Sequence, residues 1–193
     1  QSLIAQEKYL GLAALFEELS PLCENDLLSW GRYLWLKAQY SFQILNMSQC
    51  QQELLLAEKN LQRIGDIQHI AQIYLLQGRV LLQIGELVGA ADRLARNIEA
   101  KKIDEILRQQ SSRYCTQIRL LLGWKDGLLE QHQRLLKTSR VLGSIEGVAW
   151  GMLSAGMLNL SERQYSLALR RFQAAYAAAA ACGRKALLYD SHA

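Results

Sequence analysis

Small residues recur along the chain at a regular interval and mark a series of paired helices. Stretches beginning at Leu34, Tyr74, Ser112 and Met152 align with one another, and each carries one small residue in a first helix. These residues, which follow one another at intervals of 40, 38 and 40 positions, are Ala38, Gly78, Thr116 and Gly156. A period of this length is typical of stacked supersecondary units.

A second set of positions follows each small residue at a fixed distance and belongs to a second helix. Twelve residues after the small residue stand, in chain order, Cys50, Ala90, Leu128 and Ala168. Four residues further on stand the larger side chains of Leu54, Leu94, His132 and Phe172. A small residue lets the two helix backbones approach closely, and the larger side chains fill the seam with the next pair. We therefore expect an all-α fold, an α–α superhelix of antiparallel helix pairs with a period of about 39 residues.

Glycine has a different predicted role at each of three neighbouring positions. Gly78 lies where the two helices of a pair touch, and Gly85 ends the first helix, where a positive φ angle suits glycine. Gly89 falls in the first turn of the second helix, where only its small size can matter. Between pairs, Gly65 and Gly143 indicate a helix end followed by a new start.

Composition agrees with an all-helical chain outside a membrane. Half of the 193 residues are hydrophobic, and no apolar run reaches the roughly 20 residues that span a bilayer. The net charge of +4 is mild and the two signs are interleaved, which favours solvated helix faces over direct nucleic-acid binding. The four cysteines lie far apart in helical stretches and form no C-x-x-C motif, so a zinc site is not indicated. They are typical of small buried side chains in a reducing compartment, so we expect a cytoplasmic location.

The small-and-large pattern resembles the tetratricopeptide repeat (TPR). Its second-helix positions are matched by Tyr165, Ala168, Phe172 and Ala175. Another stretch of its consensus is matched by Gly78, Gly85 and Ala90. The period is longer than the roughly 34 residues of that repeat, and its closing proline is absent. The resemblance implies a single TPR-like superhelical domain over residues 1–193.

Longer, proline-free repeats of this kind look like the superhelical sensor domains of MalT/LuxR-type ATP-dependent transcriptional regulators. The stretch 12–42, with a helix, a break at Ser20-Pro21 and a first full repeat, is similar to the start of such a domain. The resemblance implies a sensing module of a bacterial transcription regulator. Because the chain begins at Gln1 and has no Walker motif, we expect it to be a fragment of a larger multidomain protein.

No catalytic constellation or cofactor motif is present in the sequence, so we do not expect an enzyme. His69, His132 and His192 lack the spacing of metal ligands, and no phosphate-binding glycine loop occurs. His132 occupies a packing position of a second helix, which favours a structural histidine. We expect neither a cofactor nor a metal ion.

The first helices of stacked pairs line the concave side of a superhelix, so we expect binding there. The candidate groove residues are Arg32, Trp35, Gln39, Gln72, Arg79, Arg113, Gln117 and Trp150. Amide and guanidinium groups supply directional hydrogen bonds, and tryptophan supplies stacking area. The alternative, that Trp35, Phe42 and Trp150 pack between repeats, remains open. Of the tryptophans, Trp124 in a predicted turn is expected to be half exposed.

The expected occupant of this groove is a protein segment or a small-molecule effector. A ligand bound there would change contacts with other domains of the same protein, because small shifts per repeat add up along a solenoid. The alternative is a general protein–protein interaction scaffold without a small-molecule ligand.

Overall fold

The computed structural model describes residues 3–182, with side chains from Gly11 onward, as helices joined by short turns. No strand occurs within this range, so the all-α prediction is confirmed. None of these helices combines the length and the apolar character required to cross a membrane. The chain divides into two compact units, Gln1–Val80 and Leu81–Ala193. The expectation of one domain over residues 1–193 remains a prediction.

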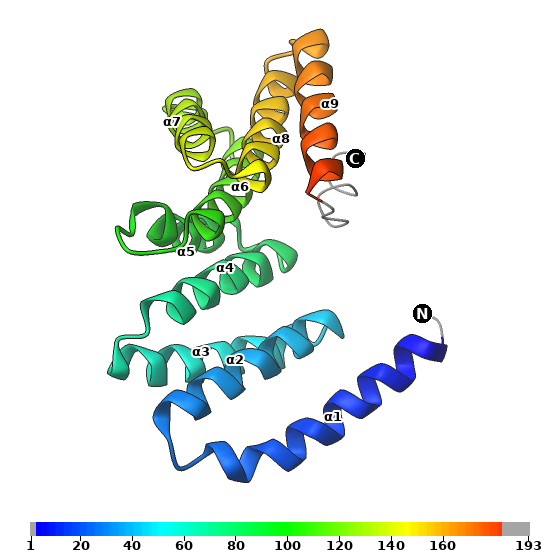
Figure 1. The fold of residues 1–193 in the computed structure, drawn as a ribbon, viewed down its shortest axis with the longest axis vertical. Coiled ribbons are helices and arrows are strands. Elements are labelled where there is room, and N and C mark those ends of the chain that lie inside the picture. The colour runs from blue at the N-terminus through cyan, green and yellow to red at the C-terminus, as the bar shows by residue number, and fades with distance from the viewer. Residues whose placement is uncertain (1–2, 183–193) are drawn as a thin grey trace. The chain divides into compact units, whose positions relative to one another are not determined.

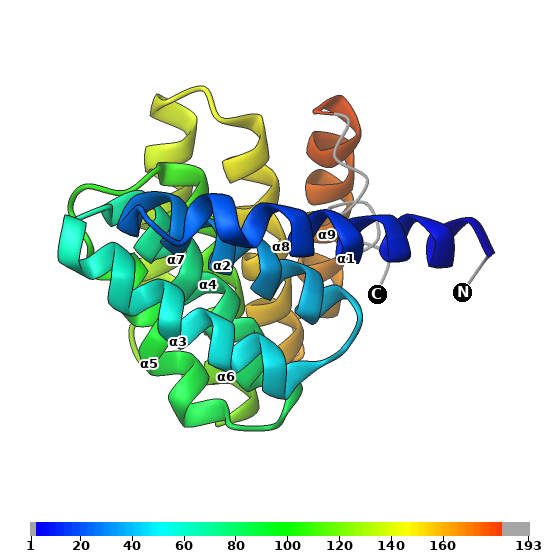
Figure 2. The ribbon, with the colours of Figure 1, turned by 90° about the horizontal axis from the view of Figure 1, so that it is seen from below.

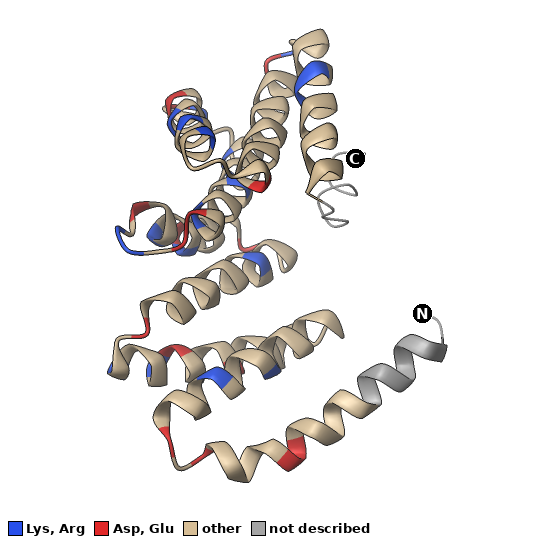
Figure 3. Ribbon diagram, viewed as in Figure 1, with Lys and Arg blue, Asp and Glu red and all other residues tan. Residues whose placement is uncertain are grey.

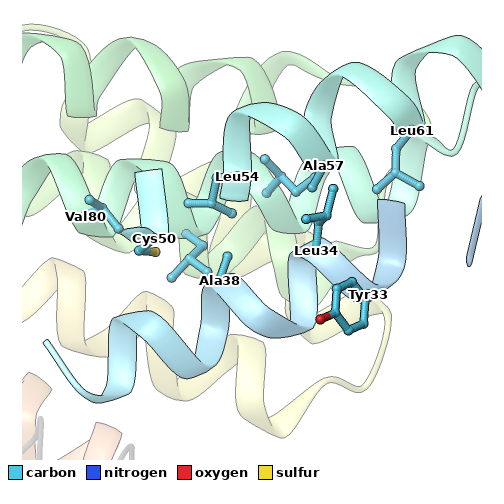
Figure 4. Packing of buried hydrophobic residues seen from close by; sticks show 10 residues of the cluster. Tyr33, Leu34, Ala38, Cys50, Leu54, Ala57, Leu61 and Val80 are labelled. Atoms are coloured by element: carbon cyan, nitrogen blue, oxygen red, sulfur yellow. The ribbon is translucent and has the colours of Figure 1, made fainter. Parts of the chain in front are cut away.

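The first unit is built on α1 (Leu3–Cys23), α2 (Leu27–Gln43), α3 (Met47–Ile64) and the part of α4 (Ile67–Gln83) up to residue 80. Helices α2 and α3 form the first predicted pair and run side by side (Figure 1). Figure 4 shows their core, in which Ala38 of α2 faces Cys50 and Leu54 of α3. All three side chains are fully buried.

The course of helix α1 differs from the prediction for the start of the first repeat. The helix continues through Ser20 and Pro21 and ends at Cys23, so the predicted break at Ser20-Pro21 was wrong. Proline is tolerated here because it lies in the last turn, where its missing N–H removes a single hydrogen bond. The helix is held to α2 by the Tyr33 hydroxyl, which donates to the carbonyl oxygen of Phe16 at 2.9 Å.

The second unit begins at Leu81 in the last turn of α4 and continues through helices α5 to α9. Their bounds are α5 (Leu87–Glu99), α6 (Glu105–Leu121), α7 (Leu128–Val141), α8 (Ile145–Ser161) and α9 (Tyr165–Ala181). Helices α8 and α9 lie side by side in both views (Figures 1 and 2). Their shared core includes Trp150, Leu153, Ala175 and Ala179, and Leu136 of α7 packs in the same cluster.

The same turn closes all four predicted helix pairs. Seven residues after each small residue the backbone is left-handed, with φ of 63°, 86°, 74° and 61° at Leu45, Gly85, Gly123 and Arg163. The next N–H in the chain then donates to the carbonyl five residues back, at 2.9, 2.9, 2.7 and 2.9 Å. This is the Schellman ending of a helix, which satisfies carbonyl groups that have no partner within the helix. The regular period therefore reflects a repeated backbone geometry.

The predicted contact register within the pairs is confirmed where one unit holds both helices. The Thr116 hydroxyl of α6 lies 3.4 Å from Nε2 of His132 on α7. At Gly156 of α8, any added Cβ would overlap the ring of Phe172 on α9, so only glycine fits without a shift. The matching contact of Gly78 with the helix after it would join residues of both units and stays a prediction.

The other predicted roles of glycine and of the caps have mixed outcomes. Gly85 has the positive φ expected at a helix end, and Gly65 and Gly143 have it between pairs. The S-x-x-Q spacing of Ser161 and Gln164 predicts a capping box for α9. That prediction was wrong, because Ser161 is still part of α8 and donates to the carbonyl of Leu158 at 2.7 Å. The turn reaches α9 through left-handed Arg163 instead.

Candidate functional site

In the first unit, two predicted groove residues meet at the start of α4. Nη2 of Arg32 on α2 lies 3.1 Å from Oδ2 of Asp66, and the same oxygen lies 2.9 Å from Nδ1 of His69. The ring of Trp35 meets the His69 ring edge-on at a centroid distance of 5.4 Å. Asp66 also accepts from the His69 backbone N–H at 3.3 Å, which ties the cluster to the first turn of α4.

The electrostatics of this cluster favour an ionised Asp66. Partial burial raises the pKa of its carboxyl, but hydrogen bonds from His69 and Arg32 outweigh that effect and hold the pKa below its ordinary value. The cluster is therefore an ion-paired helix cap that joins successive first helices.

The three remaining predicted residues of this unit are half-buried. The guanidinium carbon of Arg79 on α4 lies 4.6 Å from the centroid of the Phe42 ring on α2, in cation–π geometry. The Oε1 atom of Gln72 is buried and has no hydrogen-bond partner among the described residues. Gln39 lies on α2, one residue after Ala38 of the pair contact.

In the second unit, Arg113 of α6 and Trp150 of α8 come together but lie deep. The guanidinium carbon of Arg113 is 4.6 Å from the centroid of the Trp150 ring. Only 8% of Arg113 and 6% of Trp150 are exposed, and Trp150 belongs to the core of α8 and α9. Trp150 thus has the packing role that the sequence left open, whereas Gln117 on α6 is half-buried.

Buried carboxylates on α3 are a feature that sequence reasoning missed. Glu53, which is 3% exposed, accepts from the Ser41 hydroxyl at 2.7 Å and from Nε2 of Gln49 at 2.8 Å. Glu58 accepts from Nε2 of Gln77 on α4 at 2.9 Å. Each carboxylate lies next to a core residue in sequence, which is the only signal that could have revealed them. They crosslink the helices of this unit through buried, hydrogen-bonded charge.

A pocket of about 340 Å³ lies between α5, α6, α7 and the turn that precedes α7. We call it the α5–α7 pocket, and it is lined by Ala91, Asp92, Ala95, Ile98, Glu99, Cys115, Arg119, Trp124 and Gln131. Trp124 is 47% exposed, as predicted. Charged residues of both signs are interspersed over α5 and the segment leading to α6, whereas α8 and α9 carry few (Figure 3).

The polar side chains of the pocket differ in how they are held. Arg119 donates through Nη2 to the carbonyl oxygen of Asp126 and through Nη1 to Oε1 of Gln131, the latter at 3.3 Å. Asp92 and Glu99 are exposed on α5 and form no ion pair or hydrogen bond with other described residues. Sequence reasoning missed this pocket because it assigned Asp92 and Glu99 to a solvated helix face.

The nucleophilic and metal-binding side chains of the described range are dispersed or buried. No group of three His, Cys, Asp or Glu in that range could hold a metal ion. Burial raises the pKa of the Cys50 thiol to about 12 and also raises that of Cys115. Burial lowers the pKa of His132 to about 4, with a smaller contribution from Arg119. His192 lies outside the described residues.

Comparison with family models, with curated proteins and with solved structures gave no match to this chain.

Proposed function

We propose that the chain is a non-catalytic, ligand- or protein-binding repeat domain of the TPR-like superhelical class. By its resemblance to MalT/LuxR-type regulators, it would serve as the sensing or interaction module of a bacterial transcriptional regulator in the cytoplasm. Its occupant would be a small-molecule effector or a protein segment bound along the first helices, and its response would pass to other domains of the same protein.

One observation carries this proposal: successive first helices within a unit contact each other, and each contact includes a predicted groove residue. In the first unit, Trp35 of α2 meets His69 of α4. In the second unit, Arg113 of α6 lies over Trp150 of α8. A stack of helix pairs presents one continuous face only where its first helices lie next to each other. Such faces serve as extended binding surfaces in repeat proteins.

The second candidate is a scaffold that binds only proteins. The half-buried amides of Gln39, Gln72 and Gln117 support either function, because an amide can pair with a metabolite or with the backbone of a peptide. The two candidates differ in the size of the ligand and not in the chemistry of the surface.

Isothermal titration of the 193-residue chain against panels of sugars, metabolites and synthetic peptides tests the proposal. Gln39→Ala and Gln117→Ala change half-buried amides on first helices, whereas Gln52→Ala and Gln133→Ala change exposed amides on second helices and serve as matched controls. We expect the first two variants to weaken binding about tenfold, which corresponds to about 1.4 kcal/mol. Binding of peptides alone would favour the scaffold, and equal effects of all four variants would refute the first-helix surface.

A further inference from the structure

We propose that the α5–α7 pocket binds an organic cation, a substituted ammonium or guanidinium group. The cation would belong to a free small molecule or to a basic side chain of a peptide. This site is distinct from the first-helix surface, and its occupation does not depend on that surface being used.

The carboxylates of Asp92 and Glu99 supply the negative charge. They are seven residues apart on α5, which places them two turns apart on the same face of the helix. Neither takes part in an ion pair or hydrogen bond with a described residue. Arg119 of the same pocket donates to the backbone carbonyl oxygen of Asp126 and to Oε1 of Gln131 instead. The pocket lining therefore carries two carboxylates and one guanidinium, which leaves a net negative charge that a cation matches.

Trp124 supplies an aromatic face at the same pocket. Its backbone N–H donates to the carbonyl oxygen of Arg119 at 2.7 Å, so the Schellman turn after α6 fixes its backbone. Nearly half of the residue is exposed. The face of an indole attracts ammonium and guanidinium groups more strongly than the ring of any other side chain. Two carboxylates and one indole thus line the same pocket.

The small side chains that line the pocket distinguish α5 from the second helices of the neighbouring repeats. Ala91 and Ala95 line it on α5, and buried Cys115 lines it on α6. The positions equivalent to Ala91 and Ala95 in the repeats before and after hold larger side chains, namely Gln51, Leu55, Leu129 and Gln133. The volume of about 340 Å³ is therefore a property of this layer, and it falls at the lower end of the range of ligand pockets.

Isothermal titration of the full chain with choline and with agmatine tests the proposal, and 3,3-dimethylbutanol serves as the uncharged isostere of choline. We expect at least one cation to bind and the isostere not to bind. Trp124→Leu and Glu99→Gln should each weaken binding at least tenfold, and Ala95→Leu should abolish it by filling the pocket. Glu130→Gln, an exposed acidic residue of α7 that does not line the pocket, is the matched control and should leave binding unchanged.

A further arm separates the two sources of the cation. Binding of acetyl-Gly-Arg-Gly-amide with the affinity of agmatine would point to a peptide side chain, whereas binding of the free cations alone would point to a small molecule. Absence of binding by both cations, or binding that survives Ala95→Leu and Trp124→Leu in folded variants, would overturn the proposal. Gln39→Ala and Gln117→Ala should not affect cation binding, so failure here is separable from failure of the first-helix surface.

Discussion

The His132 imidazole contacts the Thr116 hydroxyl at the pair contact of α6 and α7, with 3.4 Å between Nε2 and Oγ1. Thr116 donates its own hydrogen to the carbonyl of Ser112 at 2.8 Å, so towards His132 it can only accept. Nε2 therefore carries the imidazole hydrogen, and Nδ1 is a buried acceptor without a partner among the described residues. A neutral histidine is held where other repeats place Leu54, Leu94 and Phe172.

Replacing His132 by leucine should remove a pH dependence of stability. The pKa of His132 is lowered from 6.5 to about 4, so the unfolded chain takes up a proton between these values that the folded chain does not. The free energy of unfolding of the native chain should thus fall by up to about 3 kcal/mol between pH 6.5 and pH 4. Urea unfolding of His132→Leu at pH 7 and pH 4.5 should lack this fall, whereas Gln133→Leu on the same helix should keep it. An equal fall in both variants would contradict the assignment.

Gly85, in the turn before α5, and Gly89, within α5, should respond oppositely to alanine. Gly85 has a φ of 86°, so Gly85→Ala should lower the free energy of unfolding by about 1 kcal/mol. At Gly89, inside α5, an added Cβ would meet only Cδ1 of Leu81 at 3.6 Å, an ordinary contact. Gly89→Ala should therefore raise stability by about 0.5–1 kcal/mol through helix propensity. Thermal unfolding measures both, and changes of the same sign would refute the placement of the turn.

Leu45 is expected to gain stability on replacement by glycine. Its φ of 63° is a left-handed conformation that strains a side-chain-bearing residue by roughly 1–2 kcal/mol. Leu142 is a matched control, because it also lies just past the end of a helix and is similarly exposed but has a φ of −80°. We expect Leu45→Gly to raise the melting temperature and Leu142→Gly to lower it. Two decreases would show that the strain at Leu45 is relieved by another contact.

Overpacking at the contact of α8 and α9 should be reversible by a second change. A Cβ at position 156 would overlap the Phe172 ring, so Gly156→Ala should destabilise the chain by about 1–3 kcal/mol. Adding Phe172→Leu, which restores the residue type of two other repeats, should recover most of that loss. Denaturant unfolding of both single variants and the double variant gives the coupling. Purely additive effects would contradict the direct contact.

The sequence predicted the helix pairs and their contact register because two helix backbones can approach closely only where the side chains between them are small, and these small residues recur regularly in the sequence. Thr116 with His132 and Gly156 with Phe172 obey that spacing. The turn at Leu45 could not be foreseen, because a non-glycine residue in the left-handed region has no sequence signature. The repeat alignment indicates a left-handed Leu45 only once the φ angles of the equivalent residues Gly85, Gly123 and Arg163 are known.

The sequence predicted the helix face on which the candidate site residues lie, but not how deeply their side chains are buried. Arg113 and Trp150 were both predicted to line the groove, and the structure places them in contact with each other. Their near-complete burial depends on how α6 and α8 pack. The α5–α7 pocket escaped prediction for the opposite reason. Ala91 and Ala95 look like ordinary helix formers until their larger equivalents in other repeats are compared.

Hydrogen exchange of the full chain with a bound effector tests the central claim most directly. The effector should be one whose affinity is unaffected by Trp124→Leu. Binding in the α5–α7 pocket then does not contribute to the measured protection. We expect backbone amides of first helices to exchange more slowly with effector bound, either in α2 and α4 or in α6 and α8. We expect no slowing at the exposed residues of the second helices α3 and α7. A panel without any binder, or protection confined to the second helices, would contradict the claim that the first helices form the binding surface.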